Sequence, residues 1–342
     1  MTTHVHFVGS VGMDSTEDFF SAVGETVKNL VRRCPDGEVG PRRLWVCYQW
    51  PVLRATGFLE KDGDNAALVG ACLLRLRSDV RPEAIGFGEL GYAREARISY
   101  QDFVAARQRG QFTAGTRFQV CLPTPWAVIE TFIAPKDALK ILPAYERAMI
   151  REVDRICAAI PHSDLAIQWD VAIEMIQWDG RFPYIPSPNN MRELFAGAFA
   201  RIGAAVPGDV ELGYHLCYGD LDAQHAIEPA DLGKAVELAN LITSSVKRPT
   251  TWVHMPVPIN RDDAGYFAPL VNLSRSPTTE LYLGLVHEKD AAEGTMRRMK
   301  AAGAFTKDFG IATECGMGRV RTPAAALKIM RIHAEAAQGF SP

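Results

Sequence analysis

The chain has 342 residues, of which 47% are hydrophobic and 23% charged, as is typical of a globular protein that buries a sizeable core. A net charge of −3 argues against a nucleic-acid or anionic-membrane partner, and no apolar run reaches the roughly 18 residues of a membrane span. The N-terminal MTTHVHFVGSVG lacks a basic segment followed by a long apolar run, so we expect no signal peptide and a cytoplasmic location. The sequence is compatible with a homo-oligomer.

Short apolar segments rich in β-branched and aromatic residues alternate with longer amphipathic segments. This alternation indicates βα units and a parallel sheet. In chain order, the predicted strands are 4–10, 43–49, 118–124, 165–170, 211–218, 251–256, 281–287 and 309–315. The last helix is predicted to begin at Thr322-Pro323, an N-cap followed by a first-turn proline.

Eight strands separated by helices predict an α/β fold, namely a single TIM (β/α)8 barrel over residues 1–342. A doubly wound sheet fits less well, because GSVGMDS after the first predicted strand is neither G-x-G-x-x-G nor a phosphate-binding loop. The segment 52–116 is too long for one crossover. It is predicted to be an irregular excursion near the barrel mouth.

Polar side chains stand at the carboxyl ends of most of the predicted strands. TIM barrels build their sites at this face, so residues far apart in the sequence are expected to lie around one ring. These residues are Ser10, Asp170, His215, Cys217, His254, His287, Glu314 and Cys315, with Glu38 just before the second predicted strand.

An H-x-C pair at 215–217 predicts a metal site. His215 and Cys217 are two residues apart on a strand, so their side chains point to the same face. Imidazole and thiolate suit zinc, and His254 and Cys315 would complete four ligands. Ligands from separate strands favour a catalytic ion, because structural zinc sites usually contain closely spaced cysteine pairs.

The alternative is that these are ordinary buried residues. Seven cysteines are scattered through a chain without a secretion signal, so reduced thiols are expected, and most of them are small core residues.

At these positions the sequence resembles the catalytic C-terminal barrel of cobalamin-independent methionine synthase and its relatives. HLCY (215–218) is similar to the H-x-C strand of this family, and ECGMGRVRT (314–322) is similar to the turn that carries its later cysteine. Glu314 stands where the family usually has Asp. IQWD (167–170) resembles the segment whose Asp contacts the amino group of the substrate. The resemblance is strongest from 165 to 322.

The resemblance implies a zinc-dependent methyl- or alkyltransferase acting on a small thiol, with a tetrahydrofolate-type methyl donor as candidate co-substrate. It implies a pocket lined by Gly9-Ser10 and Glu38. Zinc would deprotonate the thiol, Asp170 would hold a cationic group of the acceptor, and His287 would protonate the leaving group. Trp169 would stack on a flat donor.

Two departures from the family pattern leave other activities open. His254 stands where methionine synthases have a zinc-binding Glu, which would make the ion more Lewis acidic, and IQWDVAIE lacks the E-P after the Asp. The alternatives are a zinc-dependent lyase or hydrolase, a metal-free decarboxylase-like relative and a ligand-binding barrel.

Overall fold

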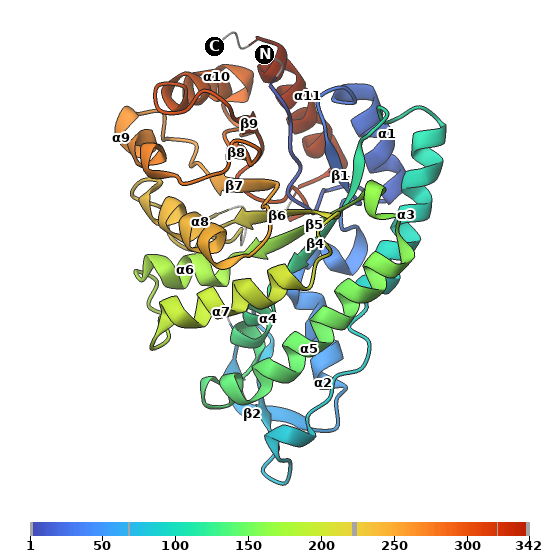
Figure 1. Cartoon of the computed structure of the whole chain (residues 1–342), viewed down its shortest axis with the longest axis vertical. Helices are drawn as coiled ribbons and strands as arrows, with labels where there is room; N and C mark the ends of the chain where they lie inside the picture. Colours follow the sequence, from blue (N-terminus) through green and yellow to red (C-terminus); the bar gives the residue numbers. More distant parts are fainter. Residues whose placement is uncertain (1–2, 68, 221–223, 320, 340–342) are drawn as a thin grey trace.

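The computed structural model describes residues 3–67, 69–220, 224–319 and 321–339. A curled parallel sheet of seven strands lies at the centre, and its strand order follows the chain (Figure 1). The strands are β1 (Arg33–Pro35), β4 (Arg117–Pro123), β5 (Leu165–Val171), β6 (Glu211–Leu216), β7 (Trp252–Pro256), β8 (Glu280–Gly284) and β9 (Gly310–Ile311). This is the arrangement of a TIM-like barrel.

The N-terminal segment lies between the two edge strands of the sheet. Val5 forms isolated parallel bridges with Val31, just before β1, and with Ile311 of β9. The backbone N–H of His6 donates to the carbonyl of Ile311 over 2.9 Å. The predicted strand 4–10 is therefore present as a bridged segment, and the sheet is not a closed eight-stranded barrel.

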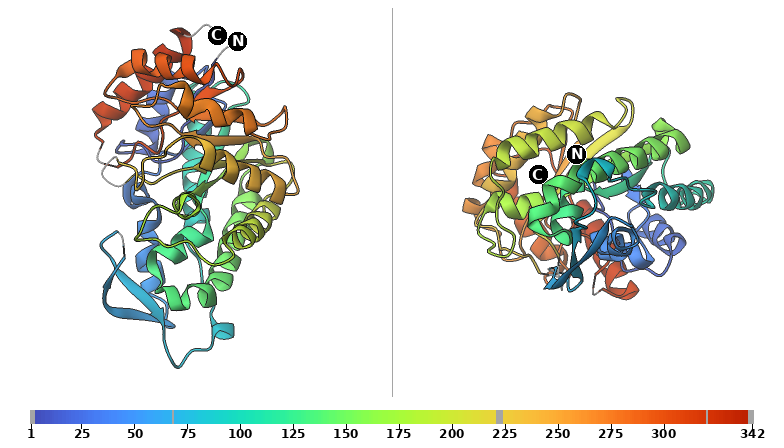
Figure 2. Two further views of the ribbon diagram at one scale, coloured as in Figure 1. Left: turned by 90° about the vertical axis from the view of Figure 1, so that its left-hand side faces the viewer. Right: turned by 90° about the horizontal axis from the view of Figure 1, so that it is seen from below.

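Helices surround the sheet, as the view from below shows (Figure 2). The longer ones are α1 (Thr16–Thr26), α3 (Tyr92–Gln108), α5 (Pro135–Ala159), α7 (Met191–Ala204), α8 (Gly233–Ser245), α10 (Ala291–Ala302) and α11 (Pro323–Gly339); the shorter ones are α2 (Gln49–Arg54), α4 (Pro125–Phe132), α6 (Ile173–Asp179) and α9 (Ala264–Phe267). The Thr322 hydroxyl accepts from the N–H of Ala325 over 3.3 Å, so the predicted N-cap of α11 is present. None of the described helices is long and apolar enough to cross a lipid bilayer.

The predicted strand 43–49 is wrong. Residues Gly40–Tyr48 form the 3₁₀ helix η1, and β1 takes the expected place in the sheet. β1 has three residues, including an arginine and a proline, so no alternating apolar pattern marks it. LWVCY is apolar because it packs on the core and the cavity described below, as Val46 does.

The irregular region extends below the barrel (Figures 1 and 2). It contains η1, α2, the 3₁₀ helix η2 (Pro82–Ala84) and an antiparallel hairpin of β2 (Leu59–Ala66) and β3 (Cys72–Leu76). The predicted limits of 52–116 differ from these elements at both ends. η1 begins before residue 52, and α3 packs against α1 and α5 as a barrel helix.

A buried glutamine organises the interior of the barrel. Gln168 on β5 donates through Nε2 to the carbonyl of Val8 over 2.6 Å and to Asp170 Oδ1 over 2.9 Å. Its Oε1 lies 2.9 Å from His6 Nε2, so the histidine donates to it. These bonds fix the N-terminal segment against β5 and orient the Asp170 carboxyl group.

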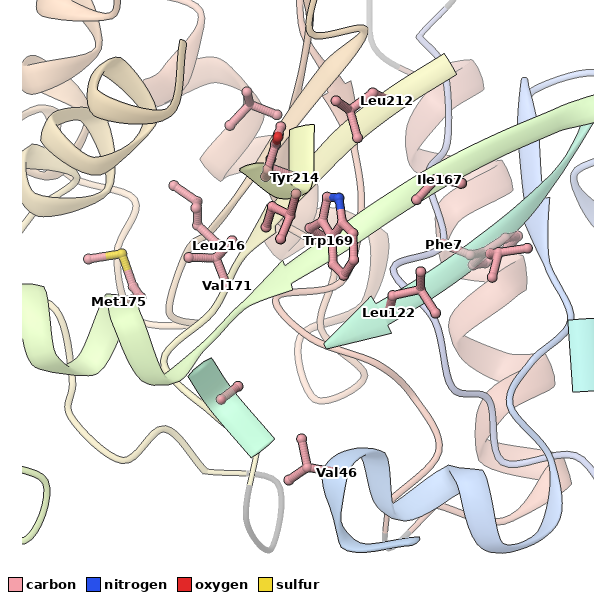
Figure 3. Packing of buried hydrophobic residues seen from close by; sticks show 14 of the residues in the cluster. Phe7, Val46, Leu122, Ile167, Trp169, Val171, Met175, Leu212, Tyr214 and Leu216 are labelled. Carbon is pink, nitrogen blue, oxygen red and sulfur yellow. The ribbon is translucent and has the colours of Figure 1, made fainter. Parts of the chain in front are cut away.

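Strand alternation turns the other residues of β5 outward. Ile167, Trp169 and Val171 lie between the sheet and the helices, near Leu122 and Tyr214 (Figure 3). Trp169 is fully buried there.

Ion pairs connect the amino ends of three strands, opposite the face that carries the candidate site. The buried Arg33 of β1 pairs with Glu211 of β6 and, over 2.8 Å, with Glu280 of β8. The more exposed Arg32 also reaches Glu280. Burial alone would raise the pKa of Glu280, but the hydrogen bonds and charge of Arg33 lower this pKa to about 2.

Candidate metal centre

Three of the predicted metal ligands meet at the carboxyl ends of the strands. One ligand atom from each of His215, Cys217 and Cys315 lies within 4.8 Å of the other two. The two sulfur atoms are 3.2 Å apart. His215 belongs to β6 and Cys217 directly follows it, while Cys315 follows β9, so the curl of the sheet brings together residues 98 positions apart.

The turn after β6 fixes Cys217. The backbone N–H of Gly219 donates to Cys217 Sγ over 3.2 Å. Gly219 has a φ of 86°, a conformation that favours glycine. The sequence HLCYG therefore supplies two of the three candidate ligands and the turn that fixes Cys217.

His254 on β7 lies beside His215, deeper in the barrel. The two Nδ1 atoms are 2.7 Å apart, and His254 Nε2 lies 3.0 Å from the carbonyl of Thr313. A carbonyl only accepts, so His254 Nε2 carries a proton. Burial lowers the pKa of His254 to about 4, so the ring is neutral and its Nδ1 must accept from His215.

This hydrogen-bond chain determines the tautomer of His215. With its proton on Nδ1, His215 keeps a free lone pair on Nε2, which is the form that ligates a metal. Both nitrogens of His254 are engaged within the protein. The group of three possible ligands, His215, Cys217 and Cys315, does not include His254.

A cavity opens beside the three ligands and contains the predicted substrate-binding carboxyl groups. It encloses about 980 Å³, part of which is open to solvent, and Ser10, Glu38 and Asp170 line it together with the ligand group. The lining mixes apolar side chains with a few polar ones, as small-molecule sites do.

Glycines allow the close approach of the segments around Ser10. A Cβ at Gly316 would overlap the Ser10 hydroxyl, and Gly318 lies against the same side chain. Gly9 has a φ of 153°, and a Cβ there would come 3.3 Å from Glu38 Oε1. The motifs GS and ECGMG thus allow the first segment and the last loop to meet beside Cys315.

The acidic pair in the cavity is poorly solvated. Burial raises the pKa of Asp170, and burial together with the charge of Asp170 raises the pKa of Glu38. The pair therefore retains a proton at neutral pH unless a cationic group binds beside it.

The loop that carries Glu38 is strained. Glu38 and Trp45 have φ values of 45° and 54°, although neither is a glycine. Both side chains line the cavity. Backbone strain of this kind is typical of functional loops, because surrounding contacts must maintain it.

Sequence reasoning missed His225, which lies in the loop after β6. Its Nε2 is 3.2 Å from Glu314 Oε2, and His287 Nδ1 is 3.7 Å from Glu314 Oε1. Although burial opposes it, Glu314 raises the pKa of His225 to about 9. In the sequence, this residue could have been noticed only as a histidine eight residues after the H-x-C motif, within a stretch that has no strand or helix pattern.

Two predicted residues lie outside the cavity lining. His287 donates from Nε2 to the carbonyl of Val257 over 2.9 Å, and its other nitrogen faces Glu314. Trp169 is buried on the outer face of β5, so it does not present its ring to a flat donor. The alternation of β5 explains this, since Asp170 points inward and its neighbour outward.

The chemistry of the donor set fits zinc. Two sulfurs and one free imidazole nitrogen form the open three-ligand set of a catalytic ion. The hydrogen bond with Cys217 and burial raise the pKa of Cys315 well above its usual value. A bound cation would supply the charge that lets both thiols lose their protons.

Comparison with known proteins shows the fold. The sequence matches no protein-family model and no curated protein. The structure is similar to a methyltransferase from Methanosarcina mazei, with a TM-score of 0.53 and 13% identity over 98% of this chain and 94% of that chain. It is also similar to a B12-independent methionine synthase from Shewanella sp. W3-18-1 in complex with selenomethionine, with a TM-score of 0.51 and 14% identity over 82% of this chain and 75% of that chain.

These identities are low, so the likeness establishes a barrel fold of the kind that methyltransferases adopt. Function has to be argued from the site itself.

Proposed function

We propose that the protein is a zinc-dependent transferase that moves a methyl or alkyl group to or from a small thiol. The observation that carries the proposal is the three-ligand group of His215, Cys217 and Cys315 at the edge of a cavity with an acidic end. Zinc held by these residues would keep a position open for the thiol sulfur, promote loss of its proton and hold it for reaction.

The residues around the cavity suit an acceptor thiol that carries an amino group. Because the pKa values of Glu38 and Asp170 are raised, a bound ammonium group would displace a proton that this pair retains, and this gives a reason for two carboxyl groups in the cavity lining. The Ser10 hydroxyl would orient the same end of the acceptor.

In the transfer step, the alkyl carbon forms a bond to the acceptor sulfur as its bond to a heteroatom of the donor breaks. The electron pair leaves with that heteroatom, which takes up a proton, so the proton lost by the thiol balances the reaction.

A cobalt-substituted protein tests the proposal directly. Cobalt(II) reports bound thiolates by charge-transfer absorption, so adding a small aminothiol is expected to increase this absorption. An increase with aminothiol but not with the matching amino alcohol supports the transferase. An unchanged spectrum would contradict it, and a water-activating lyase or hydrolase would then fit the site better.

His254 has a positioning role in this proposal. Replacing His254→Leu removes the acceptor for His215 Nδ1–H, and zinc affinity is expected to fall by about 10–100-fold. His254→Asn offers an amide oxygen in the same region and is expected to recover part of the loss. Competition with a chelator measures both affinities. A loss as complete as that of a cysteine ligand, without recovery in the asparagine variant, would show that His254 binds the ion.

A further inference from the structure

We propose that the donor is a neutral molecule with a hydrocarbon or aromatic body, and not an anionic folate. This inference rests on the proposed function and specifies the co-substrate of the same cavity. Its basis is the lining of the cavity, which combines a few acidic side chains and the candidate ligand group with many apolar side chains, called here the apolar wall.

The apolar wall begins next to the metal ligands. Gly219, whose N–H contacts Cys217 Sγ, lies where an added Cβ would be 3.9 Å from Ile176 Cδ1 and 3.9 Å from the Ala226 methyl group. On the other side of the group, the loop after Cys315 contacts Ser10. An apolar donor in the cavity would therefore contact side chains next to the candidate ligands.

Three separate parts of the chain build this wall. α6 and the segment after it contribute most of it, and η1 and the β2–β3 hairpin contribute the rest. The apolar residues concerned are Trp45, Val46, Val69, Ile173, Ile176, Phe182 and Ile185. Thr131 also lines the cavity, but its hydroxyl donates to the carbonyl of Ala127, so it adds no free donor.

Charge in the cavity argues against a polyanionic donor. Among the described lining residues, Arg319 is the one cationic side chain, and its two terminal nitrogens donate to the carbonyls of Asp220 and Leu44. The remaining ionisable groups of the cavity are acidic or belong to the metal group. Asp220 already pairs with Arg321 Nη1 over 3.5 Å. A glutamyl tail in the cavity would therefore meet carboxyl groups and an arginine whose terminal nitrogens are engaged, and desolvating its carboxylates is unfavourable.

Calorimetric titration of the full-length, metal-free protein tests the inference with three probes. The probes are 4-methylanisole, its anionic counterpart 4-methoxybenzoate, and 5-methyltetrahydrofolate. We expect 4-methylanisole to bind at least about tenfold more tightly than either anion, because an apolar ring gains from burial and a carboxylate loses its hydration. Equal or tighter binding of 5-methyltetrahydrofolate would overturn the inference.

Two substitutions at Phe182 sharpen the test. Phe182 is half-exposed, so both variants are expected to fold. Phe182→Ala is expected to weaken 4-methylanisole binding roughly tenfold. Phe182→Lys is expected to weaken it as well and to improve binding of 4-methoxybenzoate, since it adds a cation to the wall. Val271→Ala, an exposed residue outside the cavity, serves as control and should change nothing. Unchanged affinity in both Phe182 variants would contradict the proposal.

The result can be separated from that of the transferase proposal, because these titrations need neither zinc nor a thiol. Selective binding of 4-methylanisole without a thiol-dependent cobalt spectrum would contradict the transferase and support the apolar ligand site. A thiol-dependent spectrum together with tight folate binding would contradict only the present inference.

Discussion

Cys217→Ser and Cys315→Ser are each expected to reduce zinc affinity more than about 100-fold, so that both variants are purified with little metal. Each sulfur is one of the three candidate ligand atoms, and a serine hydroxyl does not ionise at neutral pH to replace a thiolate. Substituting residues that only orient the ligands typically lowers metal affinity by about 10–100-fold. Substituting a ligand itself is therefore expected to lower it further. Elemental analysis should give about one zinc per chain for the wild type.

Cys72→Ser is the matched control for this experiment. Cys72 is a half-buried thiol on the β2–β3 hairpin, outside the ligand group, so its zinc content should equal that of the wild type. Wild-type protein without zinc, or zinc that persists in both ligand variants, would contradict the metal centre. A metal-free barrel would then be the better description of the site.

Arg33→Met is expected to lower the free energy of unfolding by about 3 kcal/mol at neutral pH. The side chain is 3% exposed and joins Glu211 and Glu280, so its removal leaves two carboxylates short of a buried partner. Arg117 and Arg32 still contact these carboxylates and limit the loss. Urea unfolding of both proteins measures the difference.

This stabilisation should depend on pH in a defined direction. The pKa of Glu280 is about 2 in the folded protein and 4.5 in an unperturbed glutamate, so its contribution is complete above the higher value. It is lost as the pH falls through the folded value, because the unfolded chain takes up the proton first. The difference in free energy of unfolding between the wild type and Arg33→Met should therefore be smaller at about pH 3 than at neutral pH.

Arg32→Met tests whether burial is the cause. This arginine contacts the same Glu280, but its side chain is 47% exposed, and exposed ion pairs contribute about 0–1 kcal/mol. An equal decrease in the free energy of unfolding in Arg32→Met and Arg33→Met would contradict the assignment of the stabilisation to the buried Arg33.

The sequence predicted the later strands well because each is a short, buried apolar run. The ends of β4, β5, β6, β7 and β8 all fall within three residues of the ends of the expected segments. The first third of the chain was harder to interpret. β1 is too short for any periodicity, and η1 has the composition of a strand because it packs on the core and the cavity from a loop.

The ligand residues could also be proposed from the sequence. An H-x-C spacing on a strand places His215 and Cys217 on one face whatever the rest of the fold does. The strand-end rule for barrels then suggested that Cys315 lies nearby. These arguments need only local geometry and the order of the strands.

Other features depend on contacts between distant segments. Whether His254 binds a metal or a neighbouring ring depends on the distance between β6 and β7 side chains and on the Thr313 carbonyl. The pairing of His225 with Glu314 depends on a loop without regular pattern. Trp169 faces outward although Asp170 faces the cavity, and strand register alone decides between them.

The sequence by itself therefore determined the α/β class, most strands and two candidate ligands, His215 on β6 and Cys217 directly after it, because periodicity and two-residue spacing are local properties. Only the tertiary structure decided that the sheet has seven strands with a bridged N-terminal segment, that Glu38 and Asp170 share a cavity with the candidate ligand group, and that many apolar side chains line the same cavity. Burial, tautomers and pKa values arise from neighbours contributed by remote parts of the chain, and local pattern carries no information about these neighbours.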